Sequence, residues 1–221
     1  MRAIAPHRMG GAAWDNPSMR INTTKSIIIE MKRPPKPLAP SFYARNVLTV
    51  ARELIGTTFL VDGVGGVIVE TEAYQEDDPA SHSFNGQTER NAVMFGPPGH
   101  IYIYLSYGMH WCANIVCSEG GHASAVLLRA LAPVAGIERM EERRGLTKRV
   151  LLCSGPGRLC QALGLTRAQN GLALDAPPFE LLAGQESPPV VIGPRIGISK
   201  AVERPWRFGW AGSRFLSKRF A

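Results

Sequence analysis

The sequence has 221 residues, of which 45% are hydrophobic, and it carries a formal net charge of +7. A chain of this length can bury one good core, and nothing in it recurs with a repeat period, so we expect one folded domain. Its apolar runs fall short of the roughly 20 residues that a membrane-spanning helix needs, which argues against a helical membrane protein.

The positive charge is unevenly distributed. Residues 1–40 carry +5 and residues 195–221 carry +6, whereas the segment between them carries −4. The C-terminal stretch interleaves cations with aromatic rings, a pattern typical of nucleic-acid surfaces, although a solvated basic tail is the alternative. Candidates for contacts to a phosphate backbone are Arg90, Arg195, Lys200 and Arg207.

Residues 1–40 are rich in Pro and Gly and lack periodicity, so we expect a disordered or poorly ordered extension before a domain at residues 41–221. Met31 is one candidate for the true start of the protein. A sorting peptide is the alternative interpretation, because the first 25 residues contain several cations and only Asp15 as an acid.

The remaining chain predicts an α+β fold with a curved, largely antiparallel β-sheet, flanking helices and a protruding β-hairpin. The expected helices are residues 48–55, 137–144 and 156–163. The expected strands are residues 59–61, 67–74, 101–106, 111–117, 125–132, 179–183 and 190–193.

The strand at residues 67–74 combines acids with an aromatic ring. If it stays regular, Glu70, Glu72 and Tyr74 share one face, because side chains of a strand alternate between faces. A solvated strand end is the alternative for a single acid.

A second strand, at residues 125–132, is almost continuously apolar yet contains Arg129. A buried guanidinium needs an anionic partner, and Glu70 or Glu72 is the natural candidate. The pair is consistent either with a functional site or with a salt bridge that fixes strand register.

Two alternating strands meet near Gly108 and predict a hairpin. Its turn holds Tyr107 and Met109 where polar residues are usual, which suggests a wedge that enters something flat and apolar. Packing under a neighbouring loop is the alternative. Ile101, Ile103 and Leu105 are expected to face the core.

The hairpin also allows a prediction of register. A two-residue turn at Gly108-Met109 would place Tyr104 and Asn114 on opposite faces of the sheet. We therefore predict an odd-length loop or bulge between Tyr107 and Trp111, with Tyr104 opposite Asn114.

Cys112, Cys117, Cys153 and Cys160 lack CxxC spacing, and the five histidines do not complete a zinc pattern. We expect reduced, mostly buried thiols and no bound metal.

Several blocks of the sequence together resemble the alkyladenine (3-methyladenine) DNA glycosylase family, with agreement in order and spacing from about Phe42 to Phe220. The blocks are Glu70-Thr-Glu-Ala-Tyr74, His82, Met94-Phe95, Tyr102-Ile-Tyr-Leu-Ser-Tyr-Gly-Met109, Asn114, Leu127-Leu-Arg-Ala-Leu131 and Cys153-Ser-Gly-Pro156.

The resemblance implies a monofunctional glycosylase that flips alkylated or deaminated purines out of duplex DNA and hydrolyses the N-glycosidic bond. The implied substrates are 3-methyladenine, 7-methylguanine, ethenoadenine and hypoxanthine, and the product is an abasic site in base excision repair. No cofactor or metal is implied. We expect a monomer whose partner is double-stranded DNA, located in the cytoplasm near the nucleoid if bacterial, or in a nucleus or organelle if eukaryotic.

The resemblance also implies individual roles. Glu72 would be the general base that activates a water, and Arg129 would help to hold that water. Tyr74, His82 and Tyr104 would form the walls of the base pocket, and Asn114 would obstruct a guanine amino group. Tyr107 would be the wedge in the duplex, with Met109 beside it in the minor groove.

Independent of the resemblance, no lysine lies between Lys36 and Lys148, which predicts that the pocket offers no amine for a Schiff base and no lyase activity. Two alternatives remain open: a module that binds nucleic acid, such as tRNA, without turnover, and a sugar glycosidase. The second is weaker, because Glu70 and Glu72 lie side by side instead of flanking a scissile bond.

Overall fold

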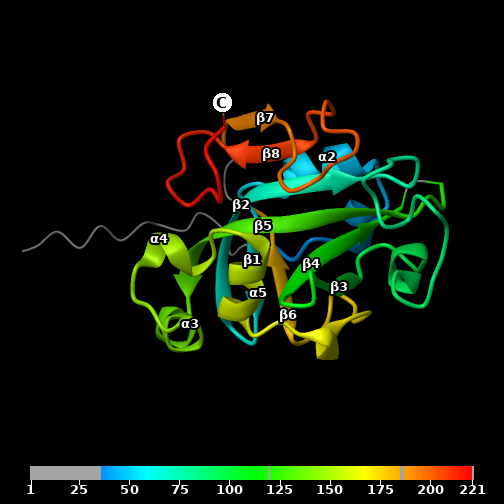
Figure 1. The fold of residues 1–221 in the computed structure, drawn as a ribbon. Helices are drawn as coiled ribbons and strands as arrows, with labels where there is room; N and C mark the ends of the chain where they lie inside the picture. The colour runs from blue at the N-terminus through cyan, green and yellow to red at the C-terminus, as the bar shows by residue number, and fades with distance from the viewer. Residues whose placement is uncertain (1–35, 119, 185–186, 221) are drawn as a thin grey trace, which may run out of the picture. The chain divides into compact units, whose positions relative to one another are not determined.

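A computed structural model describes residues 36–118, 120–184 and 187–220 (Figure 1). Of the predicted extension, residues 1–35 lie outside this described part. Residues 36–40 belong to the fold: Pro37 forms an antiparallel bridge with Leu182, and the Leu38 N–H donates to the Leu181 carbonyl at 2.9 Å. The folded part therefore begins a few residues before the predicted boundary.

One antiparallel sheet organises the described residues (Figure 1). Its strands follow the order β3-β4-β5-β2-β1-β6, and β8 pairs with both β2 and β7. The predicted α+β fold with a curved antiparallel sheet is confirmed. The strand bounds are β1 (Thr58–Val61), β2 (Val64–Tyr74), β3 (Ile101–Ser106), β4 (His110–Cys117), β5 (Ser124–Ala135), β6 (Phe179–Leu182), β7 (Val190–Gly193) and β8 (Arg207–Trp210).

Short helices pack against this sheet. α2 contacts β2, β5 and β8, whereas α5 contacts β4 and β5. α3 runs between Gly136 and Gly145, both left-handed, with φ of 63° and 64°, which suits residues without a Cβ. In the described residues no helix combines the length and apolarity needed to cross a membrane. The helical segments are α1 (Pro40–Tyr43), α2 (Val47–Glu53), η1 (Ala92–Phe95), α3 (Ile137–Arg144), α4 (Arg149–Leu152), α5 (Pro156–Leu163) and η2 (Arg167–Gln169).

The pairing of β2 with β5 is irregular on both sides of Glu70. Ile68 pairs with Leu131 and Thr71 with Leu128, but Glu70 pairs with Ala130 between them. One residue is therefore left over on each strand, Val69 on β2 and Arg129 on β5. Such bulges locally bend a strand and change the direction of a side chain, and here they accompany the approach of Arg129 to the acids of β2.

The β3–β4 hairpin closes through three residues, Tyr107 to Met109, between the paired Ser106 and His110. The predicted odd-length loop is confirmed. The predicted partner of Tyr104 is wrong: Tyr104 pairs with Cys112, and Asn114 pairs with Tyr102. Because these positions are two residues apart, Tyr104 and Asn114 still share a face.

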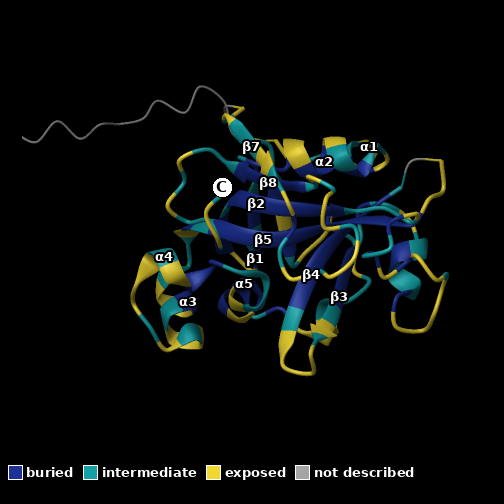
Figure 2. Cartoon of the chain, turned by 45° about the horizontal axis from the view of Figure 1, so that its top comes forward, coloured by how far each residue is buried: buried dark blue, intermediate teal, exposed yellow. Residues whose placement is uncertain are grey.

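The predicted core face of β3 is correct for two of its three residues. Ile101 and Ile103 are buried in the main core, but Leu105 is 37% exposed. Leu105 lies where the hairpin leaves the body of the protein, and Figure 2 shows the exposed end of this hairpin beyond its buried base. The sequence alternation continues past the point at which a core is available to cover it.

Candidate active site

A cavity of about 710 Å³ opens beside β2, β3, β4 and β5, within the range of ordinary ligand sites. Residues 79–82 and 196–200 complete its wall. It brings together most of the predicted site residues, namely Tyr74, His82, Arg90, Tyr104, Tyr107, Asn114, Arg129 and Lys200. A second cavity of similar volume, lined by Glu76, Phe84 and His122 among others, contains none of them.

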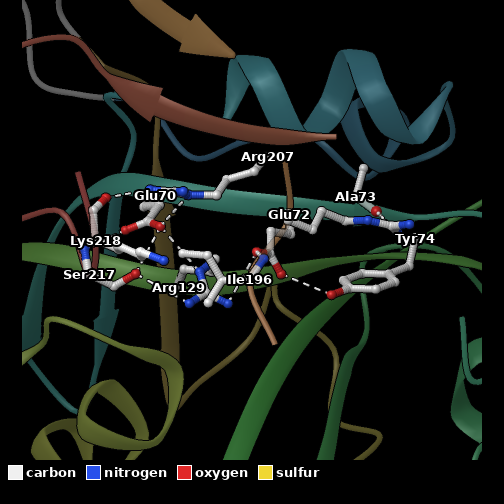
Figure 3. A network of polar contacts seen from close by, with 10 residues as sticks. Glu70, Glu72, Ala73, Tyr74, Arg129, Ile196, Arg207, Ser217 and Lys218 are labelled. Carbon is white, nitrogen blue, oxygen red and sulfur yellow. Dashed lines mark hydrogen bonds and ion pairs between the residues drawn. The ribbon is translucent and has the colours of Figure 1, made fainter. Parts of the chain in front are cut away.

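Glu72 is 0% exposed and does not itself line the cavity, but its three partners, Tyr74, Arg129 and Ile196, do. Its Oε1 accepts from the Ile196 N–H at 2.7 Å and lies 3.2 Å from Arg129 Nη1, and its Oε2 accepts from the Tyr74 hydroxyl at 2.9 Å (Figure 3). A carboxylate offers about four acceptor positions. Two hydrogen bonds and the ion pair with Arg129 thus leave Glu72 at least one position, at Oε2, for another donor.

Glu70, two residues earlier, has a different set of hydrogen-bond partners. Its carboxylate accepts from Arg207 Nε at 2.8 Å, Arg129 Nε at 3.2 Å, and both the N–H and the hydroxyl of Ser217 (Figure 3). Four hydrogen-bond donors, three at Oε1 and one at Oε2, thus hold Glu70, against two at Glu72. The predicted pairing of Arg129 with an acid is confirmed for both carboxylates, but the bonding makes Glu70 structural and leaves Glu72 as the candidate base.

Burial is the main cause that raises the pKa of Glu72 above its ordinary value of 4.5. The Arg129 charge, the Ile196 N–H and the Tyr74 hydroxyl act in the opposite direction, and Glu70 adds a smaller upward effect. A carboxylate with a raised pKa is a stronger base once ionised. Burial likewise raises the pKa of Tyr74 well above 10, so its hydroxyl stays a donor to Glu72.

Three rings that line the cavity form an aromatic wall. Tyr102 and Tyr104 stack with centroids 5.5 Å apart, and His82 meets Tyr104 edge-on at 4.4 Å. His82 Nδ1 lies 3.0 Å from the Tyr102 hydroxyl. Desolvation, followed by the nearby Arg90 charge, lowers the pKa of His82, which favours the neutral ring.

Tyr102 was not identified as a site residue from the sequence, although its alternation with Tyr104 was the available signal. Burial raises its pKa to about 12. Its backbone carbonyl also accepts from Asn114 Nδ2 at 3.1 Å, so it holds a second predicted pocket residue. Asn114 is 5% exposed and lines the cavity.

The hairpin tip presents Tyr107 and Met109 to solvent, with 85% and 71% of their surfaces exposed. Tyr107 has φ of 50°, a conformation uncommon for a residue with a side chain. The alternative in which a neighbouring loop covers this tip is therefore wrong.

Two predicted phosphate contacts are contradicted by burial. Arg207 is 3% exposed and bonded to Glu70, and Arg195 is 6% exposed and bonded through both terminal nitrogens to Asp78. Guanidinium groups already paired inside the protein are not presented to DNA. Arg90 and Lys200, by contrast, are exposed at the cavity rim.

The Arg195–Asp78 pair, which sequence reasoning missed, anchors the loop that serves Glu72. Arg195 also donates to the Ala73 carbonyl at 3.0 Å, and its guanidinium lies 4.6 Å from the centre of the Tyr74 ring. The next residue along the chain is Ile196, whose N–H reaches Glu72. The buried pair thus fixes the loop that supplies this donor.

The four cysteines are buried, as expected, and none of them forms a disulfide. Within the described ranges, no three His, Cys, Asp or Glu side chains are grouped so as to hold a metal ion.

The premise that the pocket offers no amine is wrong, because Lys200 lines it.

Comparison with known proteins agrees with this geometry. The sequence model of a family described as methylpurine-DNA glycosylase (MPG) matches residues 41–214. A relative from Rhodopseudomonas palustris strain BisB18 is 62% identical over 191 residues, covering 86% of this chain and 95% of the relative. Relatives from Nitrosospira multiformis and Agrobacterium fabrum are 60% and 59% identical, covering 80% and 81% of this chain and 92% of each relative.

All three relatives are provisionally named 3-methyladenine DNA glycosylase. The family match spans most of the described residues and includes Glu72, Arg129 and the hairpin. The chain therefore belongs to the methylpurine-DNA glycosylase family and is a DNA glycosylase, a hydrolase of N-glycosyl bonds that acts in base excision repair.

Proposed function

We propose that the protein is a monofunctional glycosylase that removes 3-methyladenine, 7-methylguanine, ethenoadenine and hypoxanthine from duplex DNA with a water activated by Glu72. The observation that carries the proposal is the bonding of Glu72. This buried carboxylate is held by two hydrogen bonds and an ion pair, and it retains at least one acceptor position beside an aromatic cavity.

In the proposed reaction, the water oxygen bonds to the anomeric carbon of the sugar while the bond from that carbon to the purine nitrogen breaks. Glu72 takes the proton from the water, and the bond electrons leave with the purine. Positive charge develops on the sugar as in glycoside hydrolysis, and a nearby carboxylate stabilises it. Arg129 orients the carboxylate and helps to hold the water.

The target base must leave the duplex before this reaction, at a cost of a few kcal/mol that is smallest for damaged or mispaired bases. Tyr107 is exposed at the hairpin tip and would fill the space left by the flipped nucleotide, with Met109 in the minor groove. The base would then stack between Tyr74, His82 and Tyr104. Asn114, which lines this pocket, would obstruct a guanine amino group.

Cationic and neutral lesions place different demands on the site. A purine that carries a positive charge, such as 3-methyladenine, leaves as a neutral molecule. A neutral purine such as hypoxanthine needs a proton as it departs. We therefore expect faster release of the cationic bases.

Contacts to the phosphate backbone are proposed for Arg90 and Lys200, the two exposed cations at the cavity rim. Lyase activity is not expected, although Lys200 is present. A lysine nucleophile is normally activated by desolvation, and Lys200 is exposed. We further propose that a monomer acts on DNA in the bacterial cytoplasm.

A pure nucleic-acid-binding module is the second candidate. The exposed hairpin and rim cations would serve binding alone, but binding does not require a buried acid held by Arg129. The discriminating experiment incubates the protein with duplexes that contain each of the four lesions and separates released bases by chromatography. Release of the free base is expected. Tight binding of every lesion duplex without release would refute the proposal.

A further inference from the structure

The C-terminal tail, residues 215–220, contacts the buried Glu70 through Ser217 (Figure 3). The family match ends at residue 214, so this segment lies beyond it. Ser217 makes the central contacts. Its N–H and its hydroxyl both donate to Glu70, the hydroxyl at 2.8 Å, and the same hydroxyl oxygen accepts from Arg129 Nη2 at 3.3 Å.

The rest of the tail is held by β7 and β8. The Arg207 guanidinium donates to the Lys218 carbonyl and lies 3.8 Å from the centre of the Phe220 ring. Gly209 and Gly193 leave room for this ring. A Cβ built on Gly209 would lie 2.4 Å from Phe220 Cε2, and one on Gly193 would lie 3.0 Å from Phe220 Cδ1. The tail therefore has a specific seat on the sheet.

Arg129 connects the tail to the catalytic acid. Its Nε contacts Glu70, its Nη2 contacts Ser217 and its Nη1 lies 3.2 Å from Glu72. A guanidinium group is rigid and planar, so fixing two of its three nitrogens determines the position of the third. The contacts of Nε with Glu70 and of Nη2 with Ser217 thus fix Nη1, the nitrogen that faces Glu72.

We propose that Ser217 is a positioning residue of this glycosylase: its hydroxyl joins Glu70 to Arg129 and so holds the guanidinium against the catalytic carboxylate. The inference rests on the proposed roles of Glu72 and Arg129 but adds a role for a residue that was not among the predicted site residues. Ser217 does not line the cavity. It acts through Arg129.

The charged and titratable groups around Glu72 come from several strands. Glu70 and Tyr74 belong to β2, and Arg129 belongs to β5. Tyr104 on β3 and Cys112 on β4 also interact with its charge. Arg129 is the group in this set that lowers the pKa of Glu72 through its charge, so looser placement of Arg129 raises that pKa further.

The test compares Ser217→Ala with Ser217→Thr, which restores a hydroxyl, and with Ser213→Ala as a matched control. Ser213 lies just before the tail, and its hydroxyl accepts from the Phe215 N–H at 3.2 Å. Two readouts are measured on the full chain: the Glu72 titration, by ¹³C NMR of labelled glutamate assigned with Glu72→Gln, and the single-turnover rate of 3-methyladenine release against pH.

For Ser217→Ala we expect the Glu72 titration and the acid limb of the rate profile to move to higher pH. The maximal rate should fall about tenfold, the value of one hydrogen bond to a charged group, while the dissociation constant for lesion duplex stays unchanged. Ser217→Thr should recover most of both effects, and Ser213→Ala should match the wild type.

A Glu72 titration in Ser217→Ala that coincides with that of Ser213→Ala would overturn the inference, even if the rate or the melting temperature falls. The proposed function fails separately. If the wild-type protein releases no base, the hydrolytic role of Glu72 is refuted, yet the NMR titration still decides whether Ser217 holds Arg129 in place.

Discussion

Replacing Arg129 with methionine removes one of the two cations that neutralise the buried Glu70 and Glu72. Removing one partner of a buried ion pair costs about 3–5 kcal/mol. Glu70 keeps Arg207 and Ser217, and Glu72 keeps the Ile196 N–H and the Tyr74 hydroxyl. We therefore expect the lower end of that range, about 3 kcal/mol.

In a domain of this size, about 1 kcal/mol lowers the melting temperature by about 2–4 °C, so Arg129→Met should lower it by about 6–12 °C at neutral pH. The loss depends on pH through Glu72. A carboxyl whose pKa is raised in the folded state destabilises the fold as pH rises through that pKa, and removing Arg129 raises it further. The difference from the wild type should shrink when acidification protonates Glu72.

Thermal unfolding measured from neutral to acidic pH tests this reasoning. Arg139→Met is the control, because Arg139 is exposed and bonds only the Asp62 carbonyl at 2.9 Å among the contacts of the described residues. The double variant Arg129→Met with Glu72→Gln should recover part of the lost stability at neutral pH. A loss no larger than that of the control, or one that stays constant as pH falls, would refute the argument.

Three further predictions concern DNA. Tyr107→Ser should weaken binding to lesion duplex more than binding to undamaged duplex in fluorescence titrations, and equal losses would reject the wedge. Lys200→Ala should reduce the dependence of log affinity on log salt by about 1, the value for one phosphate contact; an unchanged slope would exclude it. Borohydride added during excision should trap no covalent adduct between the wild-type protein and DNA. An adduct that forms with the wild type but not with Lys200→Ala would contradict this and would reveal lyase chemistry.

Local patterns in the sequence were sufficient for the elements that carry the site. Alternation placed Glu72 and Tyr74 on one face, and their hydrogen bond shows that they share it. The helix predicted at residues 137–144 matches α3, because glycines at both ends terminate it. The apolar run around Arg129 predicted a buried charge with an acidic partner, and the structure supplies two partners.

The sequence did not reveal which charged residues, far apart in the chain, form ion pairs. Residues 207–210, which form β8, were predicted only as part of a basic C-terminal stretch, because a short strand containing Arg and Gly lacks the apolar alternation that marks a strand. Its Arg207 is neutralised by Glu70, 137 residues away, and this contact turns an apparent DNA ligand into a buried ion pair. Asp78 hides Arg195 in the same way. Composition shows the charges but not which of them meet.

Register was only half determined by alternation. The requirement that Tyr104 and Asn114 share a face fixes an odd loop but allows shifts by two residues, and the observed pairing differs from the predicted one by that amount. The two bulges at Val69 and Arg129 left no sequence signal, since each strand alone continues its apolar pattern. They arise from packing between strands.

The central claim is that Glu72 performs the chemistry while other groups bind the DNA. The most direct measurement compares wild type and Glu72→Gln for both single-turnover release of 3-methyladenine and affinity for the same duplex, with Glu203→Gln, an exposed acid, as the control. We predict near-normal affinity with a rate reduced by a factor on the order of 10² or more. A Glu72→Gln protein that releases the base at the wild-type rate would contradict the account.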